Sequence, residues 1–273
     1  MKNIVITGSN RGIGYGLAEA FLERNCRVIV TGRSQSRTDK AMKRFAAKYG
    51  DERVAAYPCD VSKPDQVQAL WDAAVETFGT VDIWVNNAGI NHAMKSIWEL
   101  SPETLEDVMQ TNLLGIAYCS QVAVRGMLDQ GKGHIYNMEG HGSDGQIMAG
   151  MSGYGTSKSA VRYLTKALIK ETKGTGVKVS TLSPGMVTTD LVQDQFEGDP
   201  AGLERAKVIF DIMGDPVEKV APWLVDRMLA NNKTGASISW FTAPKILWRV
   251  LTGYIKNPQI FTTQQPASAH GKV

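Results

Sequence analysis

Short apolar runs alternate with amphipathic stretches along most of the chain. Buried strands of a parallel sheet form continuous apolar runs, whereas a helix repeats its apolar positions every three or four residues. Strand, helix and parallel strand connect in right-handed units, so this alternation predicts an α/β fold with a doubly wound parallel sheet and helices on both faces. We expect about seven strands, at Ile4–Ile6, Val28–Val30, Val54–Tyr57, Val81–Val85, His134–Tyr136, Val177–Ser180 and Ser237–Trp240.

The alternation supports one catalytic domain over residues 1–241, with two departures. The segment from about 190 to 215 breaks the rhythm, and either a mobile substrate lid or an ordinary helical excursion fits there. Residues 242–273 form an amphipathic tail rather than an independent domain. This tail either packs against the body or a partner subunit, or forms a surface for a lipid-like substrate or a membrane interface. Its apolar positions include Ile246, Leu247, Val250, Leu251, Tyr254 and Ile255.

Composition narrows the functional classes. The chain has 273 residues, 43% hydrophobic and 21% charged, and its net charge of +3 is too small to indicate nucleic-acid binding. Cys26, Cys59 and Cys119 show no metal-ligand spacing and are typical of reduced cytosolic thiols. No apolar run is long enough to cross a bilayer, and the first strand begins too early for a signal peptide. We therefore expect a soluble cytoplasmic protein without metal, or a plastid protein if a transit peptide has been removed.

A glycine-rich turn follows the first strand and opens a helix. In this context glycines allow a tight turn and a close backbone approach to a pyrophosphate, which the helix N-terminus also attracts. The pattern predicts a dinucleotide site on a Rossmann-type fold. The turn comprises Gly8, Ser9, Asn10, Arg11, Gly12, Ile13 and Gly14.

The end of the second strand indicates which dinucleotide binds. An enzyme that prefers NAD would carry a carboxylate there for the ribose 2′-hydroxyl. This chain instead reads Thr31-Gly32-Arg33-Ser34. Arg33 and Arg11 can clamp a 2′-phosphate, which favours NADP; the alternative is that both are ordinary surface charges.

Three further segments at strand ends are candidates for contacts with the dinucleotide. Asp60 and Val61 can bind the adenine through a side-chain oxygen and a backbone N–H. Small residues after the fourth strand allow close passage of the nicotinamide half, and the segment after the sixth strand can bind the carboxamide. These residues are Asn87, Ala88 and Gly89, then Pro184, Gly185, Val187 and Thr189.

Tyr154 and Lys158 stand four residues apart, which places both on one face of a helix. An ammonium near a phenol stabilises the phenolate, so we expect the pKa of Tyr154 to fall and the phenol to exchange protons while a hydride moves. Asn112 interrupts a long apolar helix, where an amide is unfavourable without a partner, and could hold a water beside Lys158.

In this order and spacing, these motifs resemble the short-chain dehydrogenase/reductase family over about residues 3–240. The resemblance implies that Tyr154 is an acid/base, that Lys158 also binds the nicotinamide ribose, and that Asn112 links Lys158 to solvent. It further implies a dimer or tetramer built through helices around residues 101–130 and 152–172.

One departure from the family pattern lies after the fifth strand. The family carries a substrate-positioning serine there, whereas this chain has Gly140 or His141 in that place. Ser143 is the nearest hydroxyl and our candidate replacement, provided that the loop is reshaped. His141 could donate a hydrogen bond instead, or be a solvated loop residue.

The altered loop is itself informative. Together with Leu182–Leu191 and Ile238–Leu247, the segment Asn137–Ser143 resembles the chlorophyll(ide) b reductase subfamily, which uses NADPH to reduce the 7-formyl group of a chlorin. With His141, Met148 and Met186 could line an adaptable apolar pocket, although core packing is the more frequent role of methionine. We expect an NADPH-dependent carbonyl reductase. The alternatives are another lipophilic substrate, such as a steroid, quinone or fatty aldehyde, or a nucleotide-sensing protein without turnover.

Overall fold

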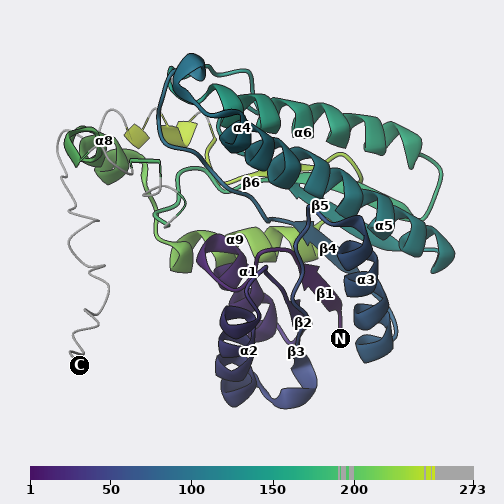
Figure 1. Cartoon of the computed structure of the whole chain (residues 1–273). Helices are drawn as coiled ribbons and strands as arrows, with labels where there is room; N and C mark the ends of the chain where they lie inside the picture. Colours follow the sequence, from purple (N-terminus) through teal and green to yellow (C-terminus); the bar gives the residue numbers. More distant parts are fainter. Residues whose placement is uncertain (190, 192–194, 197–199, 243, 247, 250–273) are drawn as a thin grey trace.

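The computed structural model (Figure 1) describes residues 1–189, 191, 195–196, 200–242, 244–246 and 248–249. Within them, seven strands form one sheet in the order β3-β2-β1-β4-β5-β6-β7, and every pairing is parallel. This sheet confirms the predicted fold class. The strands are β1 (Asn3–Ile6), β2 (Arg27–Val30), β3 (Val54–Ala56), β4 (Ile83–Asn86), β5 (Gly133–Met138), β6 (Val177–Ser183) and β7 (Ser237–Ser239).

Helices cover both faces of the sheet (Figure 1). Strand residues alternate between the two faces, and β1 shows the result: Ile4 and Ile6 join one core cluster, whereas Val5 joins the other. Helices α1, α2 and α9 pack on the first face, and α3, α5 and α6 pack on the second. The helices are α1 (Gly12–Glu23), α2 (Gln35–Tyr49), α3 (Pro64–Phe78), α4 (Pro102–Met109), α5 (Gly115–Asp129), α6 (Ser152–Glu171), α8 (Pro200–Met213) and α9 (Val217–Ala230).

The sheet reverses its winding between β1 and β4, which are neighbours although β2 and β3 separate them in the chain. At such a switch point the loops after the two strands diverge to opposite faces and leave a crevice at their carboxyl ends. The glycine-rich turn follows β1, and the segment Asn87–Gly89 follows β4. The fold therefore brings these two predicted motifs to one crevice.

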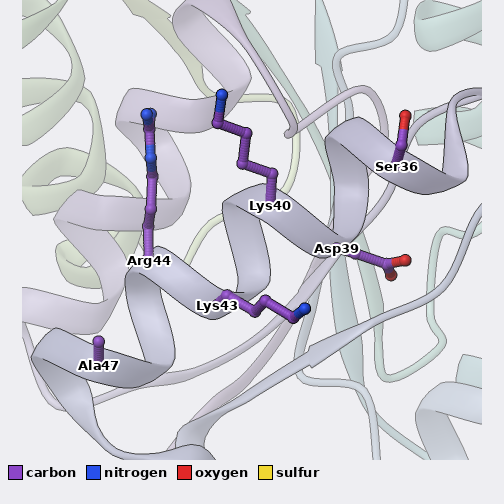
Figure 2. A pocket seen from close by; sticks show the side chains of 6 residues that line it. All are labelled: Ser36, Asp39, Lys40, Lys43, Arg44 and Ala47. Atoms are coloured by element: carbon purple, nitrogen blue, oxygen red, sulfur yellow. The ribbon is translucent and has the colours of Figure 1, made fainter.

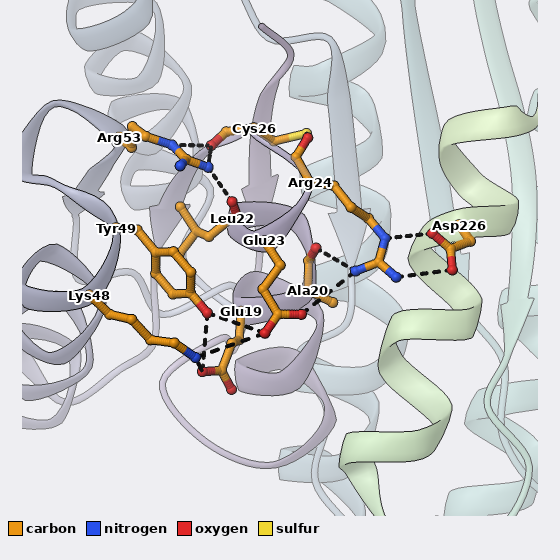
Figure 3. Close-up of polar contacts among 10 residues, drawn as sticks. All are labelled: Glu19, Ala20, Leu22, Glu23, Arg24, Cys26, Lys48, Tyr49, Arg53 and Asp226. Atoms are coloured by element: carbon orange, nitrogen blue, oxygen red, sulfur yellow. Dashed lines mark hydrogen bonds and ion pairs between the residues drawn. The ribbon is translucent and has the colours of Figure 1, made fainter.

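Hydrogen bonds and ion pairs join α1 to its neighbours α2 and α9 (Figure 3). The Arg24 guanidinium donates from Nε and Nη2 to the two carboxylate oxygens of Asp226 on α9, at 2.5 and 2.9 Å. Lys48 on α2 donates to Glu19 on α1 at 2.9 Å. Because Asp226 and Lys48 are exposed, we expect these pairs to fix orientation rather than to add much stability.

The long helix expected around Asn112 runs without a break from Pro102 to Asp129, but it is not α-helical throughout. A π-helical turn, Gln110–Leu114, joins α4 to α5. Such turns widen the helix by one residue and are frequent at functional sites. Here the turn contains Asn112, which is fully buried.

Asp215, which lies just before α9, contacts residues at the start of the C-terminal tail. Its buried carboxylate accepts hydrogen bonds from Trp240 Nε1 at 2.6 Å and Lys219 Nζ at 3.0 Å, and it pairs with Arg249. Residues 244–246 and 248–249 are helical, and the rest of the predicted tail helix lies outside the described residues. In the part of the chain that the structure describes, no helix is long and apolar enough to span a membrane.

We expect Asp215→Asn to lower the free energy of unfolding by about 3 kcal/mol, because it leaves two cations without their buried partner. Burial raises the pKa of Asp215, but hydrogen bonds from Trp240 and Lys219 outweigh it and hold that pKa below its usual value. The stabilisation is therefore complete above the unfolded-state pKa and disappears as pH falls through the folded value. Urea unfolding of both proteins should show a constant difference from pH 8 to about 5 that shrinks below about pH 4; a difference that does not depend on pH would contradict the ion-pair account.

Candidate active site

A cleft of about 250 Å³ opens at the carboxyl ends of β1, β2 and β4. Its position is the switch-point crevice that the topology creates. Most of its lining consists of residues predicted to bind a dinucleotide, and the full set is Gly8, Asn10, Arg11, Gly12, Ile13, Gly14, Gly32, Arg33, Ser34, Arg37, Cys59, Val61, Asn87, Ala88, Gly89, Ile90, Thr111, Thr189 and Leu191.

The glycine-rich turn is packed too tightly for side chains. Gly8 and Gly12 have φ values of 64° and 56°, which L-residues with side chains rarely adopt. A Cβ at Gly14 would lie 2.4 Å from the Gly8 carbonyl oxygen and 2.5 Å from Asn87 Nδ2. The turn thus exposes backbone to the cleft and closes onto the segment after β4.

The Thr7 hydroxyl joins the two sides of the crevice. Its oxygen accepts hydrogen bonds from the N–H groups of Asn87 and Ala88, both at 3.0 Å. The Asn87 side chain donates to the carbonyls of Thr7 and Gly8. Its Oδ1 is buried beside the cleft and has no hydrogen-bond partner among the described residues. An acceptor in that position suits a ligand that donates a hydrogen bond, as a dinucleotide does.

Three arginines border one end of the cleft: Arg11 from the turn, and Arg33 and Arg37 from the segment after β2. All three are exposed, so their charges can reach a ligand. The sequence prediction missed Arg37. The signal was available, because Ser34 caps α2 by accepting from the Arg37 N–H and so fixes Arg37 in the first helical turn.

The remaining cofactor candidates divide into two groups. Val61, Ala88, Gly89 and Thr189 line the cleft, as do Ser34 and Thr111, which the sequence prediction did not include. Other candidates make contacts elsewhere. The Asp60 carboxylate accepts hydrogen bonds from the Ser62 hydroxyl and N–H. Gly185 packs against the Phe241 ring, and Val187 belongs to the core. Pro184 and Ser9 are not among the residues that line the cleft.

Tyr154 and Lys158 lie in the first two turns of α6, and both are buried. The Lys158 ammonium donates to the Met138 carbonyl at 3.3 Å and lies 5.7 Å from the centre of the Tyr154 ring. Gly89 lines the cleft, and a Cβ at Gly89 would be 3.8 Å from Lys158 Nζ, so the ammonium lies close to that wall of the cleft. The predicted pair is therefore next to the predicted dinucleotide site.

In the protein without nucleotide, burial is the main influence on the pKa values of Tyr154 and Lys158. It raises the pKa of Tyr154 to about 12, so the expectation of a lowered pKa was wrong for the protein alone. Burial also lowers the pKa of Lys158 to about 8, against the opposing charge of Glu139. The phenol is consequently protonated near neutral pH, which is the state that a proton donor needs.

Asn112 has the hydrogen-bond partners that a buried amide needs, and the protein itself supplies them. Its Oδ1 accepts from the Ile90 N–H at 2.8 Å, and its Nδ2 donates to the Ile90 carbonyl at 2.9 Å and to Ser157 Oγ at 3.2 Å. The side chain therefore joins the loop after β4 to α6. Its role in holding a water beside Lys158 stays a prediction.

Gly140 occupies the position that faces the Tyr154 hydroxyl. A Cβ at residue 140 would lie 2.5 Å from that oxygen and 3.2 Å from Lys158 Cε. Ser143 is buried and holds the loop: its hydroxyl accepts from the Gly140 N–H at 3.1 Å and donates to the Lys158 carbonyl at 3.3 Å. These bonds occupy the hydroxyl that was expected to replace the family serine.

The candidate substrate-pocket residues lie in separate segments. His141 and Met148 belong to the loop between β5 and α6, and Met148 is exposed. The buried His141 Nε2 has no partner within the described residues. Met186 lies in the segment after β6, where its carbonyl accepts from the Asp215 N–H. Their role toward a substrate stays a prediction.

A second hollow lies on α2, away from the strand ends (Figure 2). Its lining comes from a single helix and consists of Ser36, Asp39, Lys40, Lys43, Arg44 and Ala47. Because no other element contributes to it, the basic residues here form a surface-facing stripe, and we assign no ligand to it.

Comparison with known proteins agrees with this geometry. The family description "short chain dehydrogenase" matches residues 2–200. The probable chlorophyll(ide) b reductase NYC1 of Arabidopsis thaliana is 34% identical, over 96% of this chain and 55% of the relative. The chlorophyll(ide) b reductase NOL of Oryza sativa subsp. japonica is 39% identical, over 84% of this chain and 66% of the relative. The chain thus spans between about half and two thirds of the length of these chloroplastic proteins.

The overall fold is also similar to that of a solved structure. ElxO with NADP bound is 28% identical, with a TM-score of 0.75 over 87% of this chain and 96% of that one.

The Gly140 geometry predicts that Gly140→Ala displaces the Tyr154 phenol and lowers redox turnover by more than about tenfold, because small misplacements of a catalytic group are costly. Gly155→Ala is the matched control, since a Cβ at Gly155 has no neighbour within 4 Å. Steady-state turnover with saturating nucleotide measures both variants. An active Gly140→Ala protein would show that residue 140 does not constrain the phenol.

Proposed function

The chain belongs to the short-chain dehydrogenase family of oxidoreductases, and from this we propose that it is an NADPH-dependent reductase of a large, mostly apolar carbonyl compound. The observation that carries the proposal is the placement of Tyr154 and Lys158 beside a glycine-lined cleft with an arginine-rich end. The 7-formyl group of chlorophyll(ide) b, reduced to a hydroxymethyl group, is our first candidate substrate.

Residues of the cleft fit NADPH. The exposed glycine backbone and the N-terminus of α1 suit the pyrophosphate, and Arg11, Arg33 and Arg37 suit the 2′-phosphate. When bound, NADPH supplies the hydride that the substrate carbonyl carbon accepts. The residues of this chain then have to place the carbonyl and deliver one proton to its oxygen.

Tyr154 is the proposed proton donor. As the carbonyl oxygen gains charge, the phenol passes its proton to that oxygen, and the C=O bond becomes an alcohol. The charged Lys158 stabilises the phenolate that remains. Burial keeps this donor protonated before the reaction, because it raises the pKa of Tyr154.

A large apolar substrate is supported by the loops around α6. The loop between β5 and α6 comes close to the start of that helix: a Cβ at Gly140 would lie 2.5 Å from the Tyr154 hydroxyl, and one at Gly142 would lie 2.7 Å from Gly155 Cα. Several apolar residues in this loop and in the loop after β4 are exposed, and Gly150 lies against Met94, which places the two loops side by side. The exposed residues are Met94, Ile97, Trp98, Ile147 and Met148. A flat macrocycle can use such a rim, whereas a small aldehyde cannot reach it.

The decisive experiment compares kcat/KM for chlorophyllide b with that for small aromatic aldehydes, following NADPH oxidation. We expect the chlorin to be preferred by at least about a hundredfold, since truncated substrates lose the binding energy of their remote parts. Trp98→Ser should reduce the value for the chlorin and leave that for small aldehydes unchanged. Equal values for both substrates would contradict the pigment assignment and leave the reductase assignment intact.

The arginine-rich end predicts that NADPH binds at least about tenfold more tightly than NADH, because a charge-assisted contact contributes roughly 1.5–3 kcal/mol. Arg33→Ala should remove most of this preference. Lys43→Ala, which removes a cation from the separate hollow on α2, is the control and should not change it. Titration of both nucleotides tests this; equal affinities in the unmodified protein would contradict the NADP assignment.

The protonation of Lys158 predicts that carbonyl reduction depends on pH, with a limb at which activity falls as pH rises. Because burial lowers the pKa of Lys158 to about 8, its charge is present below that pH and lost above it. The kcat/KM for NADPH in carbonyl reduction, which reports the free enzyme, should therefore fall as pH rises through about 8. Glu139 raises the pKa of Lys158, so Glu139→Gln should move the limb to lower pH. A limb that Glu139→Gln does not move would assign it to another group.

A further inference from the structure

His92 caps the helix that carries the predicted proton donor. Helix α6 begins at Ser152, and Met151 at its N-cap position offers no side-chain hydrogen bond. The N–H of Tyr154, in the first turn, would otherwise lack a partner. It donates instead to His92 Nε2 at 3.1 Å, from the loop after β4.

The hydrogen bonds of His92 define its tautomer. A backbone N–H can only donate, so Nε2 must be the acceptor and Nδ1 must carry the proton. His92 Nδ1 lies 2.8 Å from the Ala93 carbonyl oxygen, which accepts that proton. The backbone N–H of His92 donates to Asn91 Oδ1 at 2.9 Å. The buried ring is thus held as a neutral acceptor pointing at the start of α6.

The start of α6 is shaped to receive this ring. A Cβ at Gly153 would lie 3.1 Å from His92 Nε2 and 3.1 Å from Leu105 Cδ2. Glycine at residue 153 therefore permits the imidazole to approach the helix end. The contact involves the backbone of Tyr154 itself, so it fixes the point from which the phenol projects.

The loop that carries His92 also contacts Gln195, which lies between β6 and α8. The Met94 N–H donates to the Gln195 carbonyl at 2.9 Å, and Asn91 Nδ2 lies 3.4 Å from Gln195 Oε1. Asn91 and Met94 flank His92 in the sequence. One short loop therefore connects Gln195 to the backbone of Tyr154.

We propose that His92 is a positioning residue for Tyr154: it caps α6 from the neighbouring loop and sets the place of the phenol relative to the cleft. It does not touch the reacting atoms. This inference rests on the proposed role of Tyr154 as proton donor. A displacement of the donor slows proton delivery while the nucleotide site, built from β1, β2 and β4, stays unchanged.

The test uses His92→Phe, which keeps a ring but has no acceptor, and His92→Gln, whose side-chain oxygen can accept. His92→Phe should lower kcat by about tenfold or more with the affinity for NADPH unchanged, and His92→Gln should recover most of that loss. Ser101→Ala is the control for loss of a cap in general, because Ser101 caps α4 by accepting from the Thr104 N–H. It should leave kcat close to its original value.

Amide hydrogen exchange provides a readout that does not depend on turnover. Exchange of the Tyr154 N–H should accelerate in His92→Phe and remain slow in His92→Gln. An equal fall of kcat in both variants, or slow exchange in His92→Phe, would overturn the inference. An unmodified protein that reduces no carbonyl would contradict the proposed function, whereas the exchange measurement would still report on the cap.

Discussion

The hydroxyl of Thr7 holds together the crevice on which the rest of the site depends. The parallel sheet reverses its winding between β1 and β4, and the loops after these strands would otherwise separate freely. Thr7 accepts from the N–H groups of Asn87 and Ala88, and Asn87 returns two hydrogen bonds to the turn. Because these contacts fix both walls, the glycine backbone and the nicotinamide side of the cleft keep one relative position.

The second constraint is the seating of α6 against that crevice. Asn112, in a π-helical turn, bonds to Ile90 and to Ser157, and His92 bonds to the backbone of Tyr154. Ile90 and His92 both lie in the loop that follows β4. The same loop therefore supports the cleft and positions the helix with the proton donor, which explains how two distant sequence motifs keep the spacing that chemistry requires.

Much of this arrangement can be predicted from the sequence, because the underlying signals are local. Apolar runs identify all seven strands, and a spacing of four identifies Tyr154 and Lys158 as a pair. Other features depend on tertiary environment. The pKa of Tyr154 is raised by burial, and the spacing of residues in the sequence does not show how deeply a side chain is buried. The hydrogen-bond partners of Ser143 depend on how a glycine-rich loop folds back onto α6. The role of His92 was equally hidden, since its partner lies 62 residues away.

The central claim is that Tyr154 delivers the proton in an NADPH-dependent carbonyl reduction. The most direct measurement is the single-turnover rate of Tyr154→Phe with saturating NADPH and carbonyl substrate, together with its affinity for NADPH. The account predicts a rate lower by about 10²–10⁴-fold with unchanged affinity, because only the hydroxyl is removed. A variant that keeps more than about a tenth of the original rate would contradict the claim and require another acid at the site.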